Sequence, residues 1–132
     1  MKWFYNRIYR KQKGFTLVEL MVVIIILAVL TGIAIPSYLA LRDRARIQAT
    51  RSEMQNIATA IGVYEADTDG FPVAATMALM IPIIEPTYML DVPVNDAWGN
   101  PYTYVGTAAT YTLASTGGGT AITITDGAFV GE

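Results

Sequence analysis

The chain has 132 residues, of which 53% are hydrophobic, and its formal net charge is −2. This length suits one small domain, and the apolar fraction is high enough to indicate a membrane segment. Cysteine and histidine are both absent, which excludes disulfides, thiolate zinc sites and catalytic sites built on Cys–His or Ser–His–Asp. We therefore do not expect an enzyme.

Positive charge is concentrated at the N-terminus. The four arginines that follow Gly14 are outnumbered by eleven acids, and such an acidic main part is a poor binder of nucleic acid. No nucleic-acid partner is expected, and residues 1–14 are predicted to be a basic leader that acts in targeting. Its basic residues, with no acid among them, are Lys2, Arg7, Arg10, Lys11 and Lys13.

Residues 15–36 are predicted to form a membrane-spanning helix. The run Phe15–Ile35 is almost wholly apolar, and at 1.5 Å per residue it spans about 30 Å, the thickness of a bilayer's hydrocarbon core. The positive-inside rule places the leader in the cytoplasm and the rest outside, although the four later arginines weaken this orientation. A secretory signal peptide has a shorter apolar region, and a plain signal anchor does not explain Glu19.

Glu19 lies inside the apolar run. A carboxylate there costs a few kcal/mol, so it is normally paired, near the interface, or functional. The segment Lys13-Gly14-Phe15-Thr16-Leu17-Val18-Glu19 resembles the prepilin peptidase site of type IV pilins and type II secretion pseudopilins. The resemblance implies that a membrane-embedded peptidase cuts between Gly14 and Phe15, and that the new amine of Phe15 is N-methylated.

The same resemblance gives Glu19, Phe15 and Pro36 roles in assembly. In a filament, the Glu19 carboxylate would pair with the Phe15 amine of a neighbouring subunit and so fix the register. Before assembly the carboxylate is expected to be unpaired in the membrane, a cost that assembly relieves. Pro36 removes a helical hydrogen bond and bends the helix, or it marks the place where many pilins unwind in the filament.

Residues 37–66 are predicted to continue as an amphipathic helix that packs on a sheet. The helix should end at Asp67-Thr68-Asp69-Gly70, where Gly70 suits a C-terminal cap. One long helix thus runs from about Phe15 to Ala66, unless Pro36 interrupts it. The apolar face consists of Ile47, Met54, Ile57, Ile61 and Tyr64, with Thr50 between the first two.

Residues 67–132 are predicted to form a connecting loop and a β-sheet head. The connecting region has a short helical turn near Thr76–Met80. Three runs then alternate between apolar and polar residues, which is typical of strands: Tyr102–Val105, Tyr111–Ala114 and Ala121–Thr125. We predict an α+β fold, the pilin fold by resemblance, in which a long N-terminal helix packs on an antiparallel sheet of about three strands.

The head carries a second resemblance. Asp69-Gly70-Phe71-Pro72 and Asp96-Ala97-Trp98-Gly99-Asn100-Pro101-Tyr102 are similar to segments of the major pseudopilin of type II secretion, and we interpret the second as a turn with an aromatic anchor. In that family the last loop binds calcium. Gly118 stands where the family usually has an aspartate, so the resemblance implies at most a weak site. The positions that match calcium ligands of that family are Leu113, through its backbone carbonyl, Ser115 and Asp126.

The sequence favours a structural protein, the major pseudopilin of a type II secretion system. A cysteine-free major pilin of an extracellular pilus, used in adhesion, motility or DNA uptake, remains the alternative. An enzyme would have to gather acids around a metal, but they have no recognisable ligand spacing and suit caps and turns. Those acids are Asp67, Asp69, Asp91 and Asp96.

The resemblance also implies partners and a location. The partners are other copies of the chain, a prepilin peptidase and methyltransferase, an assembly ATPase, a membrane platform protein, minor pilins or pseudopilins, and lipid before assembly. The protein would begin in the inner membrane with its head outside the cytoplasm. It would end in a periplasmic pseudopilus or an extracellular pilus.

Overall fold

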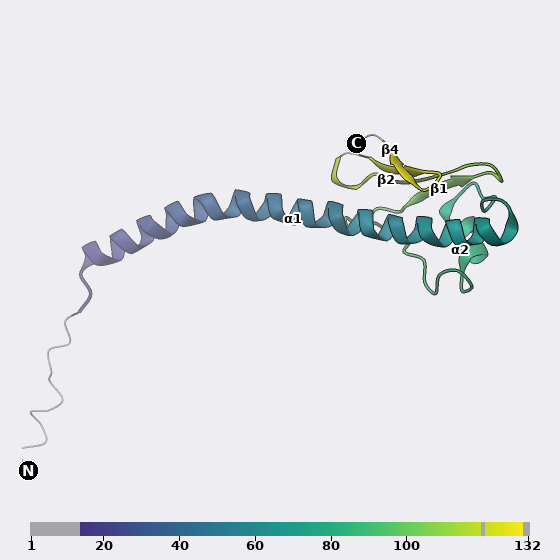
Figure 1. Cartoon of the computed structure of the whole chain (residues 1–132). Coiled ribbons are helices and arrows are strands. Elements are labelled where there is room, and N and C mark those ends of the chain that lie inside the picture. Colours follow the sequence, from purple (N-terminus) through teal and green to yellow (C-terminus); the bar gives the residue numbers. More distant parts are fainter. Residues whose placement is uncertain (1–13, 120, 131–132) are drawn as a thin grey trace, which may run out of the picture. The chain divides into compact units, whose positions relative to one another are not determined.

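The computed structural model describes residues 14–119 and 121–130 (Figure 1). The predicted leader, apart from Gly14, lies outside the described residues. The chain divides into two compact units, residues 1–40 and 41–132. Helix α1, Leu17–Thr68, contributes residues to both units.

Helix α1 is longer at its C-terminus than the sequence predicts. It contains Pro36 without an interruption. It ends where Asp69 takes a left-handed backbone conformation, with a φ of 60°, and the Asp69 amide donates to the Glu65 carbonyl at 2.9 Å. The predicted cap at Gly70 is therefore wrong by one residue, because an aspartate tolerates the left-handed conformation that most residues avoid.

The head contains one antiparallel sheet in the order β1-β2-β3-β4. Four strands are present among the described residues, whereas about three were predicted. The additional strand follows a two-residue turn at Asp126 and Gly127, whose φ angles of 50° and 84° suit a type I′ hairpin. The strands are β1 Thr103–Gly106, β2 Tyr111–Ser115, β3 Ile122–Thr125 and β4 Ala128–Val130.

Two short helical elements complete the head. Helix α2, Met77–Ile84, replaces the single turn predicted near residue 76. It buries Met77, Met80 and Ile84, so an apolar face holds it against the rest of the head. A 3₁₀ turn, η2, spans Gly117–Gly119 between β2 and β3.

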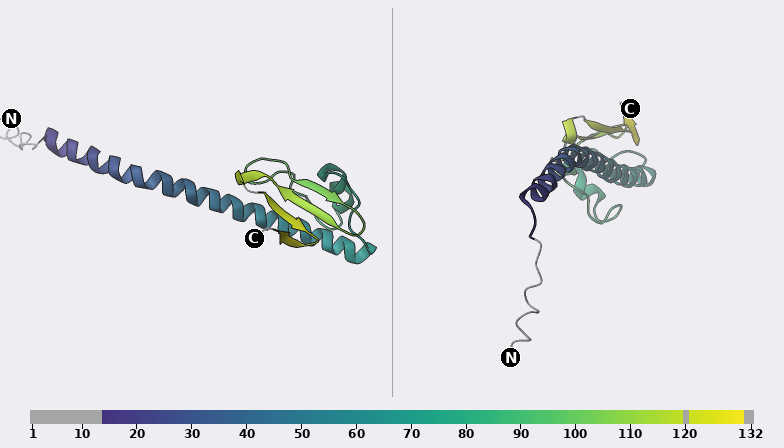
Figure 2. Two further views of the ribbon diagram at one scale, coloured as in Figure 1. Left: turned by 90° about the horizontal axis from the view of Figure 1, so that it is seen from above. Right: turned by 90° about the vertical axis from the view of Figure 1, so that its left-hand side faces the viewer.

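The hydrophobic core lies between the head part of α1 and the sheet, which runs along one side of that part of the helix (Figures 1 and 2). The predicted apolar face of the helix is confirmed. Met54, Ile57 and Ile61 are fully buried, and Ile47 and Tyr64 are partly buried against the core. The sheet contributes Tyr104, Tyr111, Leu113, Ile122 and Ile124 to the core, and Tyr102 joins them from just before β1. The predicted α+β fold is confirmed.

Candidate functional site

The N-terminal part of α1 presents its apolar side chains without any cover. Every residue from Gly14 to Ala45 is exposed, and the helix contains an 18-residue window with a mean hydropathy of 2.9. A helix that is apolar all round is stable only in a membrane or inside a larger assembly. By length and composition, α1 is the one described helix that could cross a membrane.

A reciprocal pair of hydrogen bonds closes the first turn of α1. The Glu19 carboxylate oxygen Oε2 accepts from the Thr16 amide at 2.8 Å and from the Thr16 hydroxyl at 2.9 Å. The Thr16 hydroxyl oxygen in turn accepts from the Glu19 amide at 3.2 Å. This is a capping box, which satisfies donors that a helix start otherwise leaves unpaired. Glu19 therefore has hydrogen-bond partners within its own first turn, whereas its charge pairing with a neighbouring amine stays a prediction.

Sequence reasoning missed Thr16 as a functional residue. The signal was present, because a threonine three residues before a glutamate at the start of an apolar run is the sequence pattern of a capping box. Glu19 has a local structural role in addition to any role between subunits.

The peptide bond between Gly14 and Phe15 precedes the helix. Both residues are exposed and lie outside regular secondary structure, and the Phe15 side chain is 87% exposed. A side chain at position 14 would meet nothing within 4 Å. Among the described residues, nothing therefore covers this bond.

Asp96 is the main buried acid of the head, with an exposed fraction of only 5%. Its Oδ1 accepts from the amides of Trp98 and Asn100, both at 2.9 Å. Its Oδ2 accepts from the Ser115 hydroxyl at 2.7 Å and from the Gly117 amide at 3.1 Å. Burial raises the pKa of Asp96, but the four hydrogen bonds outweigh it and hold that pKa below its usual value.

The segment around Trp98 is a turn with an aromatic anchor, as the sequence predicts. The Gly99 amide donates to the Asp96 carbonyl at 2.9 Å, and Gly99 has a φ of 85°. The Trp98 ring lies directly against the Gly117 backbone, so any side chain at position 117 would collide with it. Glycine is required there for close approach.

Two hydrogen bonds tie this part of the connecting region to α1. The Ala97 amide donates to the hydroxyl oxygen of the fully buried Thr50 at 3.2 Å. The Tyr102 hydroxyl donates to Glu53 Oε2 at 2.8 Å, and burial together with this carboxylate raises the pKa of Tyr102 well above its usual value. Thr50 therefore contributes a polar contact on the apolar helix face.

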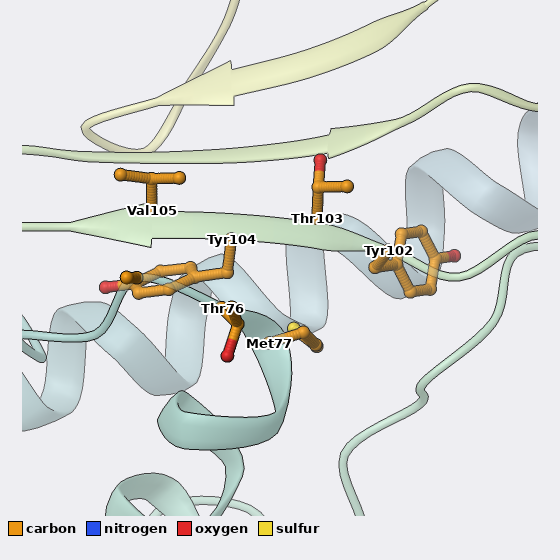
Figure 3. Close-up of a pocket in the computed structure, with 7 residues that line it drawn as sticks. Thr76, Met77, Tyr102, Thr103, Tyr104 and Val105 are labelled. Carbon is orange, nitrogen blue, oxygen red and sulfur yellow. The ribbon is translucent and has the colours of Figure 1, made fainter.

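The head also has a small hollow beside β1 (Figure 3). Its volume is about 280 Å³. Its described lining holds no carboxylate, lysine or arginine, so it offers no acid–base pair for catalysis. The residues around it are Ala75, Thr76, Met77, Tyr102, Thr103, Tyr104 and Val105.

Comparison with known families covers both units of the chain. The prokaryotic N-terminal methylation motif matches residues 9–35, and the family described as type II secretion system (T2SS), protein G, matches residues 37–125. The chain belongs to the T2SS protein G family. Both resemblances in the sequence are thereby confirmed, and the protein G branch is favoured over the extracellular pilins.

Individual members of the protein G family support the assignment. The type II secretion system core protein G of Pseudomonas aeruginosa is 33% identical over 122 residues, which cover 82% of this chain and 84% of that protein. The core protein G of Vibrio cholerae is 31% identical, with coverage of 82% and 84%. That of Escherichia coli is 31% identical, with coverage of 81% and 82%. No solved structure gives a significant match.

The three positions that the resemblance implies as calcium ligands, Leu113, Ser115 and Asp126, are not brought together. Ser115 ends β2, whereas Asp126 Oδ1 accepts from the amide of Tyr111, the first residue of β2, at 2.9 Å. At 3.4 Å per strand residue the two ends are about 14 Å apart, but ligands of one calcium ion lie within about 5 Å of each other. Leu113 lies between them, opposite Ile124. These residues do not fit a common calcium site.

The remaining acids form no alternative centre. Among the described residues, no group of three or more acids, histidines or cysteines could hold a metal ion. Asp69 ends α1, and Asp67 and Asp91 are exposed. Asp126 Oδ1 also accepts from the Thr110 hydroxyl at 2.7 Å, which fixes the start of β2.

Proposed function

We propose that this chain is the major structural subunit of a type II secretion pseudopilus. The observation that carries the proposal is the pairing of a methylation motif at residues 9–35 with a protein G head at residues 37–125. In the structure, these two parts are an apolar helix whose residues from Gly14 to Ala45 are all exposed, and a folded head. Such a helix supports polymerisation, because other copies can bury what one copy leaves exposed.

Processing precedes assembly in this proposal. A prepilin peptidase removes residues 1–14 by cutting between Gly14 and Phe15, and the new amine of Phe15 is methylated. The exposed position of this bond before α1 supports the cut. Residues 15–36 then serve as membrane anchor and assembly segment, residues 37–66 carry the head's helix, and residues 67–132 complete the head.

The protein first resides in the inner membrane, with its head outside the cytoplasm. The apolar part of α1 supports anchoring, and the basic leader supports this orientation under the positive-inside rule. Assembly then moves the subunit from lipid into a periplasmic filament. Because lipid is as apolar as the filament interior, packing and polar pairing must supply the selectivity of assembly.

Glu19 supplies this polar pairing. Both bonds from Thr16 go to Oε2, so Oε1 is available to the methylated Phe15 amine of a neighbouring subunit. A helix displaced by one turn would leave that amine unpaired in an apolar environment, so the pair selects one register. Pro36 marks the place where α1 would unwind locally in the filament, because its ring removes one helical hydrogen bond.

The partners follow from this role, and none requires catalysis by the chain itself. They are other copies, the peptidase and methyltransferase, an assembly ATPase, a membrane platform protein and minor pseudopilins. The described head offers a hydrophobic core, turns and a hollow without acid–base groups, which supports a non-catalytic subunit. No observation favours an extracellular pilus over the secretion filament.

The test is to express the chain with its secretion system and analyse both the mature N-terminus and the filaments. Mass spectrometry should find N-methylated Phe15 as the first residue. Glu19→Ala should insert in the membrane with a normally folded head but form no filaments. Thr31→Ala, which removes a hydroxyl bonded to the Leu27 carbonyl in the same apolar segment, is the matched control and should assemble. A different N-terminus, or normal filament yield from Glu19→Ala, would contradict the proposal.

A further inference from the structure

The Asp96 carboxylate joins two loops that lie far apart in the sequence. On one side are the Trp98 and Asn100 amides of the turn before β1, and on the other are the Ser115 hydroxyl and the Gly117 amide after β2. Ser115 is fully buried, as is most of Asp96. The start of the connection between β2 and β3 is thereby fastened from inside the head.

No acceptor site of this carboxylate is left for a metal ion. An ionised carboxylate offers about four lone-pair positions, and four donors occupy those of Asp96. The Ser115 oxygen also accepts from the Gly117 amide at 3.3 Å. A cation would have to displace a donor and would face the positive ends of the same N–H groups.

The surrounding residues are shaped for this closed arrangement. Trp98 packs over Gly117 and Gly118, where a larger residue would force the ring away. Gly118, with a φ of 77°, occupies the position where the family resemblance expects an acidic ligand. A side chain at position 118 would meet the Trp98 ring, so glycine there makes room for the aromatic cover.

We propose that Asp96, in place of a metal ion, holds the segment after β2 against the turn before β1. Folding of the head and closure of this segment then do not depend on calcium. Oxygen ligands of calcium hold loops together by meeting at one positive centre. Here the charges are reversed, because a negative centre gathers backbone and hydroxyl donors. The network uses only groups of the chain, so it forms whenever the head folds.

The proposal is tested with the processed chain in detergent, by thermal unfolding followed with circular dichroism. One sample contains EDTA and the other contains calcium chloride. An ion that binds only the folded head must raise the melting temperature as its concentration increases. We expect the same melting temperature in both samples. A higher value with calcium would overturn the proposal, most directly if Asp126→Asn abolished the increase.

Substitution of the acid tests the other half of the proposal. Asp96→Asn places an amide where donors converge, and it should lower the melting temperature by several degrees, equally with EDTA and with calcium. Asp91→Asn, an exposed acid in the same connecting region, is the matched control and should change nothing. Equal melting temperatures for the two variants would overturn the role of Asp96.

A milder variant keeps the test decisive if Asp96→Asn does not fold. Ser115→Ala removes one of the four donors and should lower the melting temperature by a smaller amount, again independently of calcium. A loss that calcium restores would overturn the proposal. All these measurements use the isolated subunit, so their failure leaves the assembly role of Glu19 untouched.

Discussion

The two units of this chain are stabilised in opposite ways. In the N-terminal unit, every described residue is exposed, and the interactions are those within one helix and its capping box. In the head, Met54, Leu113 and Ile124 are fully buried, and hydrogen bonds such as that between Tyr102 and Glu53 link residues distant in the sequence. The head supplies its own apolar environment, whereas the N-terminal unit depends on lipid or other copies for one.

Removal of residues 1–40 should have the largest effect and is the most direct way to break this comparison. The truncated chain should remain folded and soluble, because the core lies wholly in the later residues. It should lose membrane association and filament assembly completely. Circular dichroism and membrane fractionation are the measurements, with the full chain as the control. A truncated head that does not fold would show that the two units are interdependent.

A cavity in the core should destabilise the head strongly. Ile124→Ala removes a fully buried side chain from β3 and should cost about 2–5 kcal/mol of unfolding free energy. Val105→Ala, at a 58% exposed position in β1, should cost about 1 kcal/mol or less. Urea unfolding measures both. Equal losses would mean that the core is not where the structure places it.

Acid should weaken the head through Asp96. Its pKa is lower in the folded head than usual, so its contribution is fully present above the unfolded pKa of about 3.9 and is lost as the pH falls through the lower folded value. The unfolding free energies of the natural chain and Asp96→Asn should differ by about 1–3 kcal/mol at neutral pH, and the difference should shrink below about pH 4. A constant difference down to strongly acid pH would contradict the buried, hydrogen-bonded charge.

Two glycines should respond in opposite directions to the same substitution. Gly127→Ala should destabilise the head by about 1 kcal/mol, because Gly127 has a φ of 84° in the β3–β4 turn. Gly62→Ala should stabilise it by about 1 kcal/mol, because Gly62 lies in α1 and a side chain there meets nothing within 4 Å. A stabilised Gly127→Ala variant would argue against the type I′ turn.

The sequence predicted the features of the fold that arise from local patterns. The apolar run and the helical spacing of Met54, Ile57 and Ile61 gave α1 and its buried face. The alternation of apolar and polar residues predicted the first three strands. Strand β4 was missed because it has only three residues, although the Asp126-Gly127 pair before it is a strong hairpin signal.

The interior of the head could not be predicted in the same way. Asp96 was interpreted as a capping or turn residue, and that reading captures only its bonds to Trp98 and Asn100. Ser115 and Gly117 lie 19 and 21 residues further along the chain, and only the folded sheet brings them to the same carboxylate. The match of Ser115 and Asp126 to calcium ligands likewise said nothing about the length of β2 that separates them.

The packing of Trp98 over the glycine turn has a practical consequence. The chain contains two tryptophans, and the other one, Trp3, lies in the leader that we propose is removed. The processed subunit then has a single indole, placed beside the loop that Asp96 fastens. Its fluorescence would report the opening of that loop without an attached dye, in detergent, in vesicles and in finished filaments.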